Sequence, residues 1–88
     1  MNEQEIIALC NQTLAREFEL ELDMLKPTAR FSEDLGLDSL DAVDMVMAME
    51  EAFDYKLRDN NSLSQIRTVR DLHQYIISIL DNSQNAGR

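Results

Sequence analysis

The chain has 88 residues, which is enough for one small domain with a single core. Its 17 acidic side chains outnumber its 8 lysines and arginines, so the formal net charge is −9 at pH 7. Because there is no Lys/Arg cluster to neutralise phosphates, the composition argues against nucleic-acid binding and against docking on an anionic membrane. We also expect no direct insertion into a membrane.

The excess negative charge lies in one window, residues 31–55. This window holds eight acids and no base, whereas the rest of the chain holds nine acids and eight bases. An acidic surface attracts basic protein surfaces and repels phosphate backbones. The charge pattern therefore favours a protein partner with a basic patch.

The chain has one cysteine and one histidine. Cys10 cannot form an internal disulfide, and we expect it to point into the core as a small apolar residue. His73 alone cannot supply a histidine-pair metal site, and we expect its ring on the exposed face of the last helix. We predict no metal site and no catalytic triad. The sequence shows no apolar run of membrane-spanning length and no basic start before an apolar segment, so we expect a cytoplasmic location.

Residues 3–19 predict an amphipathic helix. Its inward stripe recurs at the helical spacing of three and four residues: Ile6, Leu9, Cys10, Thr13, Leu14 and Phe18. Residues 20–38 lack such a stripe, and Pro27 disfavours helix there. We predict a long loop in this region, pinned to the core by apolar anchors: Leu20, Leu22, Leu25, Phe31, Leu35 and Leu37.

A second helix is predicted from Asp38 to Phe53. Asp38 is a good N-cap, and Asp41 stands at the capping-box position three residues later, where Glu or Gln is usual. No Gly or Pro interrupts this segment. The predicted core stripe consists of Val43, Val46, Met49 and Phe53, with Ala42, Met45 and Ala52 beside it.

Two further helical segments follow. Leu63 and Ile66 predict a short helical turn, and Thr68 can cap a last helix that ends near Asp81. The last stripe consists of Val69, Leu72, Tyr75, Ile76, Ile79 and Leu80. We therefore predict an all-α fold: a small four-helix bundle with three longer helices, a short third helix and a long loop between the first two. A single domain would span 1–81, and residues 82–88 would form a flexible polar tail.

The run 34–41, Asp-Leu-Gly-Leu-Asp-Ser-Leu-Asp, carries the candidate chemistry. Gly36 allows the chain to turn sharply, and Ser39 is then presented in the first turn of a helix, where backbone N–H groups tolerate a phosphate. Ser39 could be a solvated serine, a catalytic nucleophile or a site of covalent attachment. A nucleophile is disfavoured because Asp41 stands where the pattern G-x-S-x-G requires glycine.

This run, continued by Val-Met-Ala-Met-Glu-Glu-Ala-Phe-Asp at 46–54, resembles the acyl carrier proteins. The resemblance extends over nearly the whole chain, from Ile6 to Ile79. It implies a 4′-phosphopantetheine arm esterified to Ser39, with Asp38 capping the helix beside it. A separate phosphopantetheinyl transferase would install the arm from coenzyme A, and the arm's thiol would carry acyl groups as thioesters. The protein would then be a carrier and not an enzyme.

The outer face of the second helix is the predicted partner-binding surface. Leu40, Asp44, Met47 and Glu51 share this face because they are spaced at i, i+4, i+7 and i+11. The resemblance implies that acids of this helix meet basic patches on ketosynthases, acyltransferases and other acyl-processing enzymes: Asp38, Asp41, Asp44, Glu50 and Glu51. We expect a monomer. The alternative function is an acidic helical interaction module without a prosthetic group.

The sequence departs from the common pattern of fatty-acid carriers after Asp54. That pattern often continues with an acidic stretch and a proline, whereas this chain has Lys56 and Arg58, with Arg67 and Arg70 soon after. The acidic surface is thus not extended onto the third helix. We hypothesise a specialised carrier, for polyketide-like or modified-lipid synthesis, rather than the main fatty-acid carrier.

Overall fold

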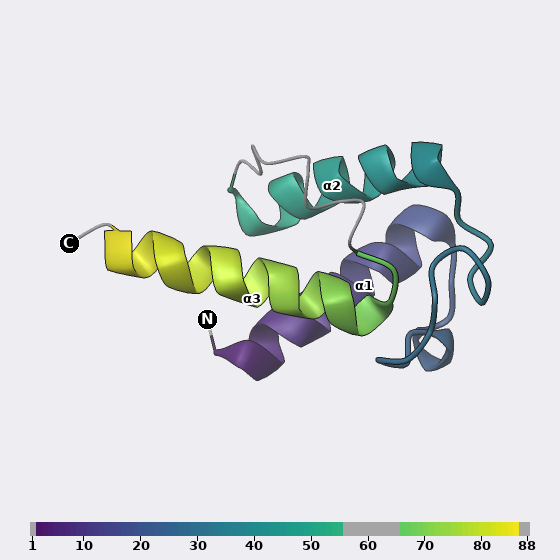
Figure 1. Ribbon diagram of the computed structural model, residues 1–88, viewed down its shortest axis with the longest axis horizontal. Helices are drawn as coiled ribbons and strands as arrows, with labels where there is room; N and C mark the ends of the chain where they lie inside the picture. Colours follow the sequence, from purple (N-terminus) through teal and green to yellow (C-terminus); the bar gives the residue numbers. More distant parts are fainter. Residues whose placement is uncertain (1, 56–65, 87–88) are drawn as a thin grey trace.

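The computed structural model describes residues 2–55 and 66–86, and in these ranges the fold is all-α (Figure 1). The three α-helices are α1 (Glu3–Phe18), α2 (Ser39–Phe53) and α3 (Val69–Ala86). A short 3-10 helix, η1 (Leu22–Met24), lies in the long connection between α1 and α2. The all-α fold and the long first loop are confirmed. The short third helix was predicted around Leu63 and Ile66. Leu63 lies outside the described residues, and Ile66 lies in no helix.

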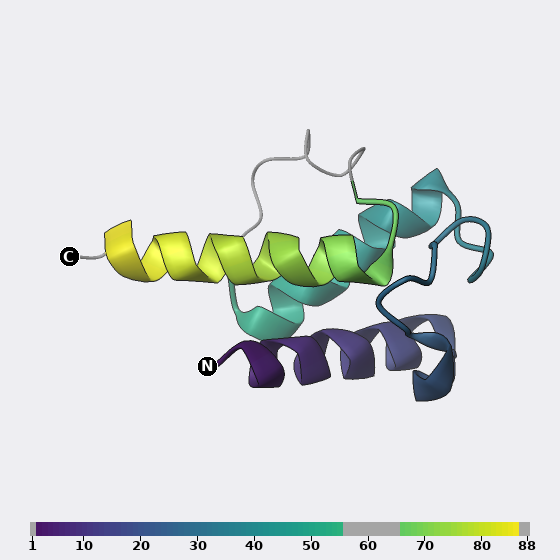
Figure 2. The ribbon, with the colours of Figure 1, turned by 60° about the horizontal axis from the view of Figure 1, so that its bottom comes forward.

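The direction of the helices places two helix starts at one end of the molecule. Figures 1 and 2 show that α2 and α3 both run opposite to α1. The N-termini of α2 and α3 therefore lie at the same end of the molecule, and the chain's own N-terminus lies at the other. This arrangement brings residues near 39 and near 68 to a common region, although they are far apart in sequence.

The core is built from one face of each helix and from the loop before α2. Its buried apolar residues are Ile6, Cys10, Leu14, Leu25, Ala29, Phe31, Met45, Val46, Met49, Val69, Leu72 and Ile76. Cys10 is fully buried as predicted, and burial raises the pKa of its thiol to about 12. A thiol with so high a pKa remains protonated at neutral pH. Cys10 therefore packs in the core as a small, uncharged side chain.

The predicted core stripe of α2 is wrong at one position. Val43 is 52% exposed, whereas Met45, Val46 and Met49 are buried. Successive residues lie about 100° apart around a helix. A stripe centred on Met45, Val46 and Met49 therefore leaves Val43 at its edge, toward solvent. The valine is apolar, but its side chain belongs to the outer surface of α2.

The loop before α2 is tied to the segment that precedes α3. The backbone N–H of Phe31 donates to the carbonyl of Arg67 at 2.9 Å, and the N–H of Val69 donates to the carbonyl of Ala29 at 3.0 Å. These bonds accompany an isolated antiparallel bridge between Arg30 and Thr68. Of the predicted loop anchors, Leu25 and Phe31 are buried, and three others are partly buried: Leu20, Leu35 and Leu37.

Two further sequence predictions differ from the structure. Leu22, expected to be an anchor, is 57% exposed; it lies in the short helix η1, none of whose residues is buried. The helix α3 continues to Ala86, five residues beyond the predicted end at Asp81. The flexibility of residues 82–88 stays a prediction.

His73 is buried, which corrects the expectation that it faces solvent. Its side chain is 5% exposed, and its Nε2 lies 2.8 Å from Oδ1 of Asn11, which joins α3 to α1. A polar ring can be buried when it has a hydrogen-bond partner, and here the partner lies 62 residues away in sequence. Periodicity within α3 alone could not reveal that partner.

The burial of His73 predicts lower stability in mild acid. Burial lowers the pKa of this ring below its ordinary value of 6.5. As pH falls through that ordinary value, the unfolded chain takes up a proton before the folded chain does, so the free energy of unfolding decreases. We expect urea denaturation to show lower stability at pH 5.5 than at pH 7.5.

His73→Gln is the control for this pH effect, because glutamine can still donate to Asn11 but does not titrate. The wild-type chain should lose more stability than the variant between the two pH values. The pKa values of Asp34 and Asp71 are also lowered, from an ordinary value of 3.8. Both carboxyl groups therefore titrate below the interval from pH 5.5 to pH 7.5. Equal losses in the two proteins would show that His73 is not the responsible group.

Candidate functional site

Ser39 is the first residue of α2 and is exposed. The chain reaches it through Gly36, whose φ of +70° lies in the left-handed region that glycine adopts without strain. The next turn is held by the N–H of Leu37, which donates to the carbonyl of Phe31 at 2.8 Å. Among the described residues, the Ser39 hydroxyl makes no hydrogen bond, so its oxygen is available to an incoming group.

Two aspartates hold the start of α2 by a reciprocal capping box. Oδ1 of Asp38 accepts from the N–H groups of Leu40 (2.9 Å) and Asp41 (3.1 Å). In return, Oδ2 of Asp41 accepts from the N–H of Asp38 at 2.9 Å. The predicted cap is confirmed, with aspartate in the place usually taken by Glu or Gln. Ser39 is thus held on a rigid helix start whose capping does not need its side chain.

The structure gives Ser39 no activating base from histidine. Nε2 of His73 is engaged with Asn11 in the contact between α1 and α3. The ring is not among the residues that line the space next to Ser39. A general base must lie within hydrogen-bond reach of the proton that it removes. His73 is therefore not placed to act as a general base for Ser39.

An open groove of about 810 Å³ lies beside Ser39. One wall comes from the loop before α2 and from the first turns of α2, and the other comes from the residues that precede and begin α3. Its lining residues are Arg30, Phe31, Ser32, Glu33, Leu37, Asp38, Ser39, Ala42, Val43, Ile66, Arg67, Thr68 and Asp71. The sequence did not reveal this groove, because it forms where three separate segments meet.

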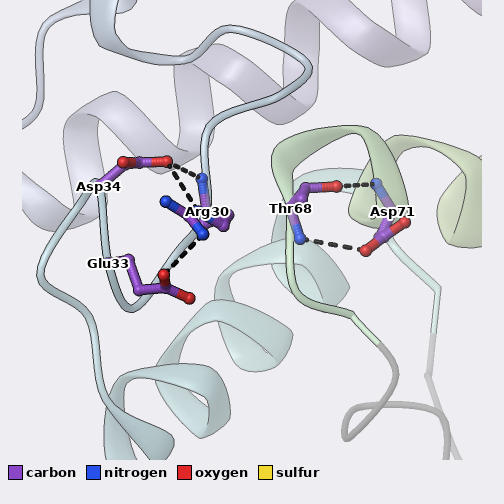
Figure 3. A network of polar contacts seen from close by, with 5 residues as sticks. All are labelled: Arg30, Glu33, Asp34, Thr68 and Asp71. Atoms are coloured by element: carbon purple, nitrogen blue, oxygen red, sulfur yellow. Dashed lines mark hydrogen bonds and ion pairs between the residues drawn. The ribbon is translucent and has the colours of Figure 1, made fainter.

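Arg30 and Glu33 line one side of the groove. Figure 3 shows the polar contacts of Arg30 with Glu33 and Asp34. The guanidinium of Arg30 contacts Glu33 at 2.6 Å and Asp34 at 3.5 Å. Oδ2 of Asp34 also accepts from the backbone N–H of Arg30 at 2.7 Å. This backbone bond is the main cause that lowers the pKa of Asp34 below 3.8. The charge of Arg30 is therefore already balanced by neighbouring carboxylates.

A second capping arrangement forms the other side, at the start of α3 (Figure 3). Oδ2 of Asp71 accepts from the N–H groups of Arg67 (3.0 Å) and Thr68 (3.1 Å), and the Thr68 hydroxyl accepts from the N–H of Asp71 at 3.1 Å. These backbone bonds, that of Arg67 foremost, lower the pKa of the Asp71 carboxyl. The predicted capping role of Thr68 is confirmed.

The predicted outer face of α2 lies toward solvent. Leu40 is 77% exposed and Met47 is 60% exposed, and Asp44 and Glu51 are exposed beside them. Val43 also lies on this face, although helical periodicity had predicted it in the core. Two of the predicted acids, Asp41 and Glu50, are only half-buried. The face combines apolar side chains with carboxylates.

The described part of the chain fits a phosphopantetheine group better than a metal ion. The exposed hydroxyl of Ser39 offers an oxygen for a phosphodiester, and the adjoining groove has apolar and charged walls. Within 2–55 and 66–86, no three His, Cys, Asp or Glu side chains are grouped so as to hold a metal ion. None of the helices in these ranges is long and apolar enough to cross a membrane.

Comparisons with known proteins point to the same group. A family model described as a phosphopantetheine attachment site matches residues 11–76. An acyl carrier protein from Cyanidioschyzon merolae is 39% identical over 77 residues, which cover 88% of this chain and 84% of the relative. An acyl carrier protein from Syntrophobacter fumaroxidans is 43% identical over 63 residues, which cover 72% of this chain and 76% of the relative.

Proposed function

We propose that this chain, which belongs to the acyl carrier proteins, bears its phosphopantetheine arm on Ser39. Members of this family are carriers without catalytic activity, and the arm bears acyl groups on its thiol. The observation that supports Ser39 is its exposed hydroxyl, which opens onto the groove and makes no hydrogen bond among the described residues. Such an arm brings an acyl group to an enzyme at high effective concentration without a large binding surface.

The residues around Ser39 act by positioning it. Asp38 and Asp41 hold the helix start through backbone N–H groups, so the hydroxyl projects from a rigid support. His73 is engaged with Asn11 and is not placed to act as a base for Ser39. In the transfer, the Ser39 oxygen would attack the phosphorus that bears the pantetheine part of coenzyme A, the pyrophosphate bond would break, and the nucleotide part would leave. A group of the phosphopantetheinyl transferase would take the serine proton. The transferase supplies the catalysis, and this chain supplies a well-placed acceptor oxygen.

The experiment that tests this function is loading followed by site mapping. The purified chain is incubated with a phosphopantetheinyl transferase and coenzyme A, and its intact mass is measured. We expect the gain of one arm, located by tandem mass spectrometry on the peptide that contains Ser39. An arm found on another residue, or no arm with several transferases, would contradict the assignment.

The outer face of α2 is the proposed docking surface for the transferase and for synthase enzymes. Leu40, Val43 and Met47 offer apolar contact area, and Asp44 and Glu51 offer carboxylates to basic patches. Charges at the rim of an interface mainly raise the association rate and are individually weak. Weak, steered contacts suit a carrier that must visit several enzymes in turn. Ketosynthases and acyltransferases are the partners that we propose beyond the transferase.

Reversing one charge on this surface should slow loading. We expect Asp44→Lys to reduce the transferase kcat/KM by about two- to tenfold, because a steering attraction becomes a repulsion. Glu3→Lys is the matched control, because Glu3 is exposed and is the first residue of α1, a helix that starts at the end of the molecule away from the start of α2 (Figure 1). Rates measured from intact mass at low and high salt should converge for Asp44→Lys and wild type. Equal slowing by both variants would point to net charge instead of docking on α2.

We further propose a specialised pathway for this carrier. Exposed Arg70 lies in the first turn of α3, and exposed Arg67 lies in the segment before it, so this part of the surface carries basic side chains. Enzymes that recognise a continuous acidic surface would then dock less well. Intact-mass analysis after incubation with ketosynthases and acyl-loading enzymes of fatty-acid and polyketide-type pathways tests this. Efficient use by the general fatty-acid enzymes alone would contradict it.

A further inference from the structure

Arg67 is a cation on the groove wall whose charge is not balanced by an ion pair. Arg67 is exposed, and it is one of the residues that line the groove beside Ser39. Arg30 lines the same groove, but its guanidinium is paired with Glu33 and Asp34. Within residues 2–55 and 66–86, Arg67 has no such carboxylate contact. Its charge contributes to the lowered pKa of Asp71 without forming an ion pair.

The backbone of Arg67 is held in place on both sides. Its N–H donates to Oδ2 of Asp71 at 3.0 Å, and its carbonyl accepts from the N–H of Phe31 at 2.9 Å. Figure 1 shows that this segment lies at the same end of the molecule as the start of α2. The Cα of Arg67 therefore keeps its position across the groove from Ser39, and only the side-chain torsions set where the guanidinium lies.

The acidic groups of the groove are already committed to other partners. Asp38 accepts from the N–H groups at the start of α2, Asp71 accepts from those at the start of α3, and Glu33 contacts Arg30. A phosphodiester on Ser39 would add one negative charge to this region. Arginine presents a planar fork of N–H donors that matches phosphate oxygens. In the described structure, Arg67 is the groove-lining cation that remains available for that charge.

We propose, on the premise that Ser39 bears the arm, that Arg67 pairs with the phosphodiester and holds the first part of the arm in this groove. Leu37, Val43 and Ile66 supply apolar contact to the carbon atoms that follow the phosphate. An exposed ion pair is weak, and it raises the ratio of docked to free arm by about two- to fivefold. The arm is therefore bound only weakly to the carrier, and an enzyme can readily displace it from the groove. Arg67 is a positioning residue in this scheme.

The test compares the unloaded and loaded chain by NMR, with loading itself followed by intact mass. The chain is labelled with ¹⁵N, and the amide shifts of residues 66–68 and the ³¹P shift of the arm are recorded. We expect loading to shift these amides in wild type and in Arg67→Lys, which keeps the charge. In Arg67→Gln the shift changes on loading should be smaller, because the ratio of docked to free arm is lowered about two- to fivefold. Arg70→Gln is the matched control, because it removes the same charge from an exposed residue outside the groove lining.

A salt titration of the loaded wild-type chain gives a second measurement that needs no variant. An ion pair at the surface is screened as ionic strength rises, so the wild-type shifts should approach those of Arg67→Gln. Loading without a shift at residues 66–68, or equal shifts in wild type and Arg67→Gln, would overturn the role of Arg67 and leave Ser39 as the attachment site. Failure of the wild-type chain to gain the arm would instead overturn the proposed function.

Discussion

Replacing Ser39 with alanine is expected to abolish the mass gain that a phosphopantetheinyl transferase and coenzyme A produce on the wild-type chain. The phosphodiester requires the serine oxygen, and alanine has none. The fold should persist because the start of α2 is capped by Asp38 and Asp41, not by Ser39. Circular dichroism and the thermal midpoint of Ser39→Ala should therefore match wild type, while intact mass shows no arm.

Ser32→Ala is the matched control for this experiment. Ser32 is also exposed and lines the same groove, but it lies in the loop before α2 instead of at a helix start. We expect it to gain the arm at the wild-type rate. If Ser39→Ala still gained the arm, the site would lie on another hydroxyl.

Failure of the wild-type chain to gain an arm from several transferases would favour an acidic interaction module without a prosthetic group. That alternative makes a different prediction for partner binding. A complex with a basic protein would be indifferent to Ser39→Ala and sensitive to charge reversal at Asp41 or Asp44. Isothermal titration calorimetry with a candidate partner separates the two functions.

The parts of the site that depend on neighbouring residues could be predicted from the sequence. The capping box of Asp38 and Asp41 closes over three residues, and so does that of Thr68 and Asp71, so local spacing carries most of the information. The placement of Ser39 in the first turn of α2 follows from the same local rule. The amphipathic stripe of residues 3–19 was likewise sufficient for α1, whose observed end at Phe18 differs by one residue.

The features that depend on distant residues could not be predicted. The groove brings together the loop at 30–33, the start of α2 and residues 66–71, and its wall is held by hydrogen bonds between the loop and the segment before α3. His73 can be buried because its Nε2 donates a hydrogen bond to Oδ1 of Asn11, which lies far away in the chain. Val43 shows the limit of periodicity, because an apolar residue at the edge of a stripe can face either the core or solvent.

Two valines on α2 test whether helical periodicity alone can tell a buried position from an exposed one. Val43 and Val46 are three residues apart and were both assigned to the core by periodicity, but they are 52% and 8% exposed respectively. We expect Val46→Asp to lower the free energy of unfolding by on the order of 3–5 kcal/mol, because it places an uncompensated charge among apolar side chains. Since small domains are marginally stable, this loss removes much of the folded population.

Val43→Asp makes the same chemical change at the exposed position and serves as the control. We expect it to change the free energy of unfolding by within about 0.5 kcal/mol, as for ordinary surface substitutions. Urea denaturation followed by circular dichroism measures both variants. Similar destabilisation by both would mean that Val43 packs in the core after all. If Val43→Asp folds normally but is loaded more slowly, the result would instead assign this side chain to the docking face of α2, where an apolar contact has been replaced by a charge.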